Sequence, residues 1–189
     1  AFHSLIFPYL AGLPHHRDKL AVQEALVESG LPYAILQPTM YMQNVLNERD
    51  RILREGVYAL PHSPASRLGM VDLRDVGEAA AIVLTDPSHA GGTYELAGPD
   101  CLTRHEMCAI LSEALGRPVR AALRDLDEWR EEAGRSRTPW QVERVALMHR
   151  HYDTHGLVGG NPHTLLMILG RAPGGFRAFV RREFIESPD

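Results

Sequence analysis

Short apolar segments alternate with helical segments along the chain, and this alternation constrains the fold more than any other feature of the sequence. Residues 33–36 form one such apolar segment between Pro32 and Pro38. Short runs that are apolar throughout are typical of parallel strands buried on both faces of a sheet. Further strands are expected at 57–60, 68–71, 93–97 and 119–123. Strands that alternate with helices predict an α/β protein with a mainly parallel sheet.

Proline and glycine residues mark the ends of the expected helices. Pro14 and Gly30 predict a helix over 14–29. Its apolar face is expected to carry Val22, Ala25, Leu26 and Ser29. Thr103 and Glu106 have the spacing of a capping box, which predicts the start of another helix. Helical patterns also cover 39–56, 72–84, 125–133, 139–155, 162–169 and 173–184. The helical C-terminal part predicts a smaller subdomain appended to the sheet.

Charge and cysteine content exclude several classes of protein. The chain has 24 acidic and 20 basic side chains, a balance that does not favour nucleic acid or anionic lipid as a direct partner. It contains no run of about 18 apolar residues, so no membrane span is expected. Cys101 and Cys108 are seven residues apart, which fits neither a C-x-x-C pair nor a disulfide scaffold. We therefore expect a cytoplasmic protein.

Lys19 is the only lysine among the 20 basic residues, and it follows His15 by four positions. On a helix this spacing places the two side chains about 40° apart, one turn from each other. A lysine there can donate to ribose hydroxyls and lower the proton affinity of a neighbouring acid, and an imidazole can pass a proton. The alternative interpretation is an exposed basic first turn. Because the chain otherwise uses arginine, the lone primary amine favours the functional interpretation.

Three segments together resemble a known family. They are residues 15–44, from His15-His16-Arg17 to Met42-Gln43-Asn44, then 71–79 (Val-Asp-Leu-Arg-Asp-Val-Gly-Glu-Ala), then 92–99 followed by Leu102-Thr103. In this order they resemble the NmrA-like branch of the atypical short-chain dehydrogenase/reductases. The resemblance implies a Rossmann-type NAD(P)-binding domain with a small C-terminal α/β substrate subdomain. Residues 1–56 and 68–100 would belong to the Rossmann-type core, and 57–67 and 101–189 to the subdomain.

The resemblance also implies a site at the nicotinamide end of the cofactor. Lys19 would lie by the nicotinamide ribose, with His15 in the place of the superfamily's tyrosine. Ser4, at the end of a strand that resembles the family's fifth, would lie near the nicotinamide. The implied cofactor contacts are Lys19, Pro38, Thr39, Met40, Tyr41 and Asn44. Since the tyrosine is replaced, hydride transfer to a quinone-like acceptor is favoured over chemistry on an alcohol.

The sequence has no glycine-rich turn after a first strand, which a dinucleotide pyrophosphate needs. The glycines at 156, 159 and 160 have the wrong spacing and are expected to form a loop. If Ala1 lies inside the fifth strand, roughly 100 residues of the family domain, about four βα units, precede it. Binding of NAD(P) to these 189 residues would then be weak or absent. A second copy or another chain would cover the open edge of the first strand.

The leading hypothesis is the C-terminal portion of an NmrA-like NAD(P)H-dependent oxidoreductase, acting on a small carbonyl or quinone-like acceptor. One alternative is a regulatory protein that senses NAD(P) without catalysis, and another is a cofactor-free oligomeric remnant. A metal site is not expected, because His151 and His155 share a helix face without a third ligand at firm spacing.

Overall fold

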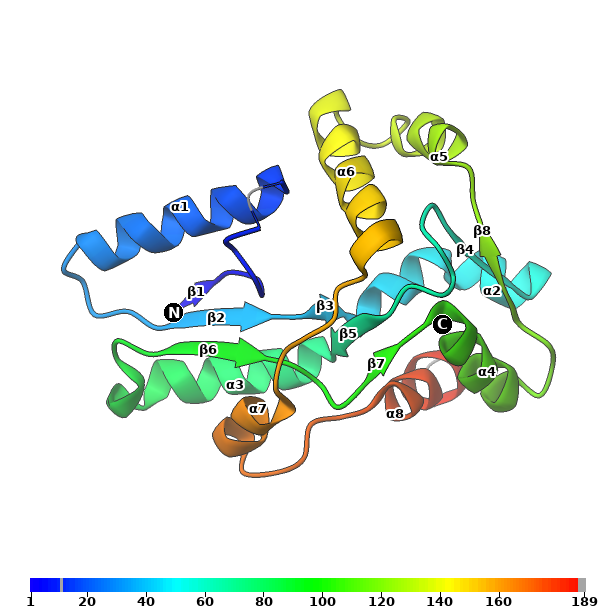
Figure 1. Ribbon diagram of the computed structural model, residues 1–189. Coiled ribbons are helices and arrows are strands. Elements are labelled where there is room, and N and C mark those ends of the chain that lie inside the picture. Colours follow the sequence, from blue (N-terminus) through cyan, green and yellow to red (C-terminus); the bar gives the residue numbers. More distant parts are fainter. Residues whose placement is uncertain (11, 187–189) are drawn as a thin grey trace. The chain divides into compact units, whose positions relative to one another are not determined.

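The computed structural model describes residues 1–10 and 12–186, and these form two compact units (Figure 1). The first unit comprises Ala1–Met42, Gly69–Asp100 and Gly159–Gly175. The second unit comprises Gln43–Leu68, Cys101–Val158 and the C-terminal segment that starts at Phe176. None of the helices in the described ranges is long and apolar enough to cross a membrane.

The first unit contains a parallel sheet in the order β1-β2-β6. Its strands are β1 (Phe2–His3), β2 (Ile35–Pro38) and β6 (Thr93–Leu96). All four residues of β2 are buried, which confirms the prediction of a parallel strand covered on both faces. The strand starts two residues later than predicted, at Ile35, although the Tyr33 carbonyl accepts a hydrogen bond from the Gly91 N–H at 2.6 Å just before β6.

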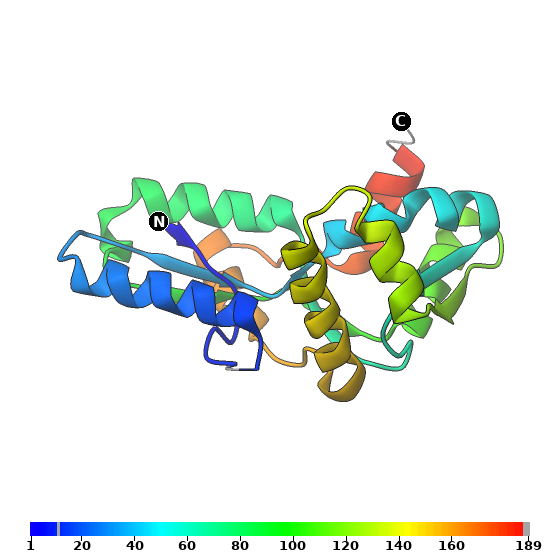
Figure 2. The same cartoon turned by 90° about the horizontal axis from the view of Figure 1, so that it is seen from above.

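Helices lie on both sides of this sheet. Both views place α1 (Pro14–Glu28) on one side and α3 (Leu73–Thr85) on the other (Figures 1 and 2). Helix α7 (Pro162–Leu169) packs against α3 and β6, and its Leu165 is fully buried. One apolar cluster joins these elements and consists of Ala34, Leu36, Val71, Val76, Ala79, Val83, Leu96 and Leu165. Residues 162–169 are therefore part of the core of the first unit.

Helix α1 buries a polar face. The prediction that Val22 lies on a buried apolar face is wrong, since Val22 is 46% exposed. The buried side chains of the helix are His16 and Gln23. These two polar groups find partners: the Nδ1 atom of His16 lies 2.8 Å from the Phe7 carbonyl oxygen, and Gln23 hydrogen-bonds to Ser4. A helix face that supplies hydrogen bonds to buried groups need not be apolar.

The helix predicted over 39–56 starts later than expected. Its first residues form β3 (Met40–Tyr41), which pairs in parallel with β5 (Leu68–Val71) through Met40↔Met70 and Tyr41↔Val71. The Thr39 N–H donates to the Leu96 carbonyl at 3.0 Å, so strand pairing continues past Pro38. A 3₁₀ helix (Met42–Glu48) and α2 (Arg49–Glu55) follow. Helix α2 ends, as predicted, at Gly56, whose φ is 65°.

The second unit combines a two-stranded parallel ladder with helices. Its strands β4 (Val57–Leu60) and β8 (Arg120–Leu123) pair in parallel. Helix α4 (Arg104–Leu115) begins with the predicted capping box of Thr103 and Glu106. The remaining elements are β7 (Cys101–Leu102), α5 (Leu126–Ala133), α6 (Pro139–His155), α8 (Phe176–Val180) and a π-helical segment (Arg181–Glu186). A short 3₁₀ turn (Pro87–His89) belongs to the first unit.

The two compact units divide the chain differently from the predicted core and subdomain at two segments. Residues 43–56 lie in the second unit, where α2 packs beside β4. Residues 159–175 lie in the first unit, because α7 packs on α3 and β6.

Candidate functional site

The candidate site lies in the first unit, where β1 and β2 end side by side (Figure 1). The Ser4 N–H donates to the Leu36 carbonyl at 2.8 Å, and the Ile6 N–H donates to the Pro38 carbonyl at 2.9 Å. The carboxyl ends of parallel strands are where α/β sheets bind ligands. We call the residues gathered here the carboxyl-end cluster, which consists of His3, Ser4, Lys19, Thr39 and Tyr41.

Ser4 is held by a buried chain of amide side chains. It is 2% exposed, and its Oγ accepts a hydrogen bond from Gln23 Nε2. Gln37 Nε2 in turn donates to Gln23 Oε1 at 3.1 Å. Because Gln23 fills an acceptor position on Oγ, the hydroxyl proton of Ser4 is directed elsewhere. Neither glutamine was predicted as a site residue. For Gln23, the only sequence signal was a polar side chain within a helix that packs on the sheet, and for Gln37 it was a polar side chain within a buried strand.

Lys19 contacts the end of β1. Its Nζ donates to the His3 carbonyl at 3.1 Å and lies 5.4 Å from the centroid of the Phe2 ring. An ammonium group has three N–H donors, so this contact fixes the side chain and leaves donors for a ligand. His15, one helical turn earlier, is half-buried, and its ring centroid is 6.1 Å from that of His16.

Tyr41 contacts His3. The phenol oxygen lies 2.9 Å from His3 Nε2, and the two ring centroids are 5.9 Å apart. Burial raises the pKa of Tyr41 above its usual value of 10. Partial burial of the imidazole, and then the charge of Lys19, lower the pKa of His3 below 6.5. His3 was not predicted as a site residue, and its one signal in the sequence is its place next to Ser4.

Thr39 lies at the carboxyl end of β2 with a buried hydroxyl. The side chain is 4% exposed, and its Oγ1 has no hydrogen-bond partner within residues 1–10 and 12–186. Gly160 passes directly over this threonine: its φ is 87°, and a Cβ there would lie 3.0 Å from Thr39 Cγ2 and 2.7 Å from Ala97 Cβ. Glycines 159 and 160 lie in a loop, as predicted, and this loop approaches the sheet too closely for a side chain.

The other residues implied as cofactor contacts have different surroundings. The Pro38 carbonyl accepts the hydrogen bond from Ile6, and Met40 is half-buried in β3. Asn44 is exposed and belongs to the second unit, in the 3₁₀ helix Met42–Glu48. The structure therefore gathers Ser4, Lys19 and Tyr41 around His3, with Thr39 at the adjacent strand end.

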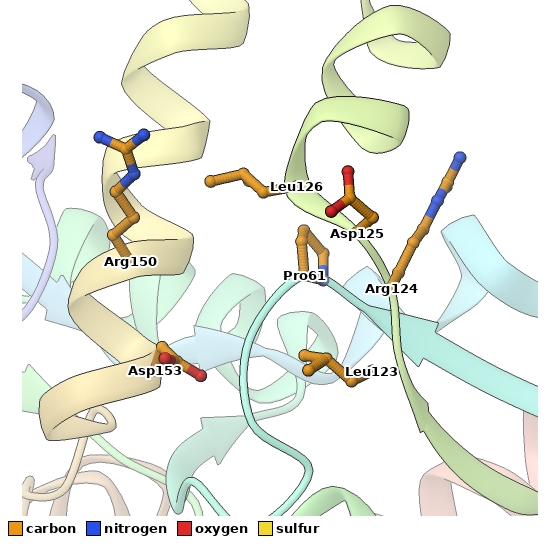
Figure 3. A pocket seen from close by; sticks show the side chains of 7 residues that line it. All are labelled: Pro61, Leu123, Arg124, Asp125, Leu126, Arg150 and Asp153. Carbon is orange, nitrogen blue, oxygen red and sulfur yellow. The ribbon is translucent and has the colours of Figure 1, made fainter.

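The second unit has a shallow hollow of about 450 Å³ between β8, α5 and α6 (Figure 3). Its lining residues are Pro61, Leu123, Arg124, Asp125, Leu126, Arg150 and Asp153. Several of its polar groups already serve the structure: Arg124 pairs with Glu132, and Asp125 caps α5 by accepting from the N–H of Asp127 at 2.8 Å. Asp153 Oδ1 accepts from the Ser63 N–H at 2.6 Å. The hollow thus combines apolar side chains with polar groups that mostly have partners already.

Potential metal ligands do not gather in the described part of the chain. No group of three or more His, Cys, Asp or Glu side chains there is placed to hold an ion. The rings of His151 and His155 are 4.8 Å apart between centroids at the end of α6.

Curated proteins similar to this chain include several reductases. NAD(P)H azoreductase of Xenophilus azovorans is 36% identical over 98 residues, which are 52% of this chain and 34% of that protein. The (4-alkanoyl-5-oxo-2,5-dihydrofuran-3-yl)methyl phosphate reductase of Streptomyces griseus is 30% identical over 155 residues, 82% of this chain and 54% of that protein. The chain thus spans about a third to a half of the curated relatives it matches.

Solved structures confirm the Rossmann-like α/β fold. The NADPH-dependent quinone oxidoreductase of Escherichia coli in complex with NADPH superposes with a TM-score of 0.82 and 21% identity, covering 96% of this chain and 64% of that one. The triphenylmethane reductase of Citrobacter sp. in complex with NADP(H) gives a TM-score of 0.80 and 20% identity, covering 95% and 64%. A sequence model described as the NmrA-like family matches residues 6–128. The chain belongs to the NmrA-like family.

Proposed function

We propose that this chain serves in an NAD(P)H-dependent oxidoreductase that reduces a small carbonyl or quinone-like acceptor. The observation that carries the proposal is the position of Lys19, whose ammonium group is held by the His3 carbonyl at the carboxyl ends of the parallel strands. The relatives named above as azoreductase, phosphate reductase and quinone oxidoreductase support the same class of reaction.

The carboxyl-end cluster fits the nicotinamide end of such a cofactor. Lys19 Nζ offers N–H donors suited to ribose hydroxyls. The buried Thr39 hydroxyl lacks a partner in the described ranges and would gain one from a carboxamide. When bound, the reduced nicotinamide supplies a hydride to the acceptor.

The residues of the chain would orient the reactants and provide hydrogen bonds. Gln23 holds the Ser4 oxygen, so that the Ser4 hydroxyl proton is available to a bound carbonyl. Lys19 would fix the ribose, and its positive charge would stabilise negative charge that develops on an acceptor oxygen. The Tyr41 phenol, whose pKa burial raises further above its usual value of 10, is protonated at neutral pH and would donate a hydrogen bond from the neighbouring strand.

A cofactor sensor without turnover is the second candidate, and it is favoured by the histidine at position 15. The two functions differ in a measurable way. A reductase consumes NADPH when an acceptor is added. A sensor binds oxidised and reduced cofactor with different affinities and consumes neither.

The test is NADPH oxidation with quinone and azo acceptors, together with NADPH affinity by calorimetry. Both are measured on the protein as its gene encodes it, including any residues upstream of Ala1, and the 189-residue chain alone is expected to bind weakly or not at all. Lys19→Ala should weaken NADPH binding about tenfold, as expected for the loss of one charged hydrogen bond. Arg17→Ala, exposed on the same helix, is the matched control. Unchanged affinity in Lys19→Ala, without turnover on any acceptor, would refute the proposal.

A further inference from the structure

The contact between Tyr41 and His3 joins two strand ends that backbone pairing holds in place. His3 is aligned with Leu36 in the β1–β2 ladder, and Tyr41 with Val71 in the β3–β5 ladder. The phenol oxygen and His3 Nε2 are 2.9 Å apart, while the rings are tilted by 33° with centroids 5.9 Å apart. This is the geometry of a hydrogen bond at the ring edges rather than of stacked rings. The pair is therefore preorganised by the fold.

The two side chains differ in their access to water. His3 is exposed, whereas Tyr41 is half-buried in the carboxyl-end cluster. In the tautomer with a proton on Nε2, the imidazole donates to the phenol oxygen, and the phenol O–H then points to a third group. The contact with Tyr41 uses Nε2, so Nδ1 is the ring nitrogen of this exposed residue that can exchange a proton with water. An imidazole in this position links bulk water to a phenol inside the site.

The surroundings of the pair favour a neutral imidazole at His3 and a protonated phenol at Tyr41. Lys19 reaches His3 from α1, and Tyr41 reaches it from β3. Partial burial and the Lys19 charge lower the pKa of His3, so the imidazole is neutral at pH 7. The phenol of Tyr41 is protonated at pH 7, and burial raises its pKa further above the usual value of 10.

We propose that Tyr41 is the proton donor of the reduction and that His3 resupplies its proton from water. The inference rests on the proposed function, in which reduced nicotinamide gives a hydride, with its electron pair, to the acceptor. As negative charge develops on the acceptor oxygen, the Tyr41 O–H bond breaks and a new O–H bond forms on the acceptor. In one concerted step, His3 Nδ1 takes a proton from water, which leaves as hydroxide, and Nε2 gives its proton to the phenolate. The net change is one hydride and one solvent proton added to the acceptor.

Tyr41→Phe tests the donor. It removes the phenol O–H and should lower kcat about 100-fold or more, the usual range for loss of a general acid, while NADPH affinity changes less than about twofold. Tyr9→Phe is the matched control, because Tyr9 is 66% exposed in the same unit and has no place in the cluster; its kcat should equal that of the native chain.

Two variants of His3 separate proton transfer from positioning. His3→Gln keeps an N–H that can donate to the phenol oxygen but cannot pass a proton, so kcat should fall about tenfold. In His3→Ala, kcat should fall at least as far, and it should recover when imidazole is added to the buffer. A role in positioning alone predicts native kcat in His3→Gln and no response to imidazole.

A measurement on the protein without cofactor adds an independent readout. NMR titration of the native chain should give His3 a pKa below 6.5, and Tyr41→Phe should shift this value because the ring loses its hydrogen-bond partner. If His3 titrates identically in both proteins, the contact is absent in solution and the relay is wrong. If the native protein reduces an acceptor and Tyr41→Phe is as fast, the relay is wrong while the proposed function stands. If the native protein reduces no acceptor, the proposed function fails, and the relay with it.

Discussion

The Nδ1 atoms of His62 and His149 lie 3.0 Å apart inside the second unit. The two rings are stacked, with centroids 5.2 Å apart and planes inclined by 22°. One Nδ1 must carry a proton and the other a lone pair, so the contact is lost when both imidazoles are protonated. His62 is 3% exposed, and Trp129 covers His149 with ring centroids 4.9 Å apart. Burial lowers the pKa of His62 to about 3 and that of His149 to about 4, with the nearby Arg104 adding to both shifts.

The first prediction is that mild acid destabilises the second unit. Both histidines are neutral in the folded state, and in the unfolded chain they take up protons near their ordinary pKa of about 6.5. Stability is therefore present above pH 6.5 and is lost as the pH falls through 6.5 toward 4. The expected loss between pH 7 and pH 5.5 is about 2.5 kcal/mol for the two groups together.

Urea unfolding followed by tryptophan fluorescence measures this loss, since Trp129 and Trp140 are the only tryptophans and both belong to the second unit. His149→Leu should reduce the dependence on pH by about half, because one of two protonations is removed. His155→Gln, exposed at the end of the same helix, should keep the native dependence. Equal slopes in the native chain and His149→Leu would contradict the prediction.

The second prediction concerns Arg104, which is 3% exposed and bonds backbone carbonyls instead of a carboxylate. Its NH1 donates to the Ala122 carbonyl at 2.7 Å and its NH2 to the His62 carbonyl at 2.8 Å. Arg104→Lys keeps the charge but loses the planar fork, so at least one buried carbonyl is left without a donor. We expect a loss of about 2–3 kcal/mol in the unfolding free energy of the second unit, measured by urea titration. Arg54→Lys, at a side chain that is 81% exposed, should change it by less than about 0.5 kcal/mol.

The third prediction concerns Asp75, whose side chain is 6% exposed in the first unit. Its Oδ1 accepts from Arg171 at 2.7 Å and its Oδ2 from the Gly174 N–H at 2.7 Å. Asp75→Ala leaves both donors without this partner, and we expect a loss of about 2–3 kcal/mol. Thermal unfolding followed by circular dichroism checks it. Asp50→Ala removes an 81% exposed carboxylate from a surface pair and serves as the control. A similar small effect in both variants would show that the Asp75 contacts contribute little.

The fourth prediction compares two glycines with positive φ. At Gly160 (φ 87°) a Cβ would meet Ala97 Cβ at 2.7 Å, whereas at Gly30 (φ 69°) it would meet nothing within 4 Å. Both alanine variants carry the backbone cost, but only Gly160→Ala must also move its neighbours. Gly160→Ala should therefore lower the unfolding free energy by about 1–3 kcal/mol more than Gly30→Ala. If the two variants have equal melting temperatures, the loop at Gly160 does not pack closely against the sheet in solution.

Much of the fold could be predicted from the sequence because the local signals and the tertiary structure agree. The capping box at Thr103 and Glu106 and the caps at Gly30 and Gly56 depend on a few neighbouring residues, and each is where it was expected. The buried strand at β2 is recognisable since both its faces must be apolar. The start of β3 was missed, because Met40 and Tyr41 are strand residues only through their pairing with β5, 30 positions away along the chain.

The site was predicted less completely, for a related reason. Ser4, Lys19 and Tyr41 could be selected from the resemblance to a family. His3, Gln23 and Gln37 carry no motif, and they matter only because the fold brings them to these residues. Buried polar side chains of this kind are identified by their partners, which spacing along one element does not reveal.

Helix α7 has a consequence for the order in which the chain folds during synthesis. Leu165 completes the apolar cluster of the first unit, and Arg171 and Gly174 supply the donors to Asp75. All three follow residues 101–158, which belong to the second unit. A nascent chain can pair β2 with β6 early, yet it leaves Val71 and Leu96 incompletely covered until residue 175 has left the ribosome. By then both strands of the second unit's ladder, β4 and β8, have already been synthesised. A pause in translation between residues 123 and 160 would therefore leave that ladder formed. The apolar surface of the first unit would stay exposed to chaperones during the pause.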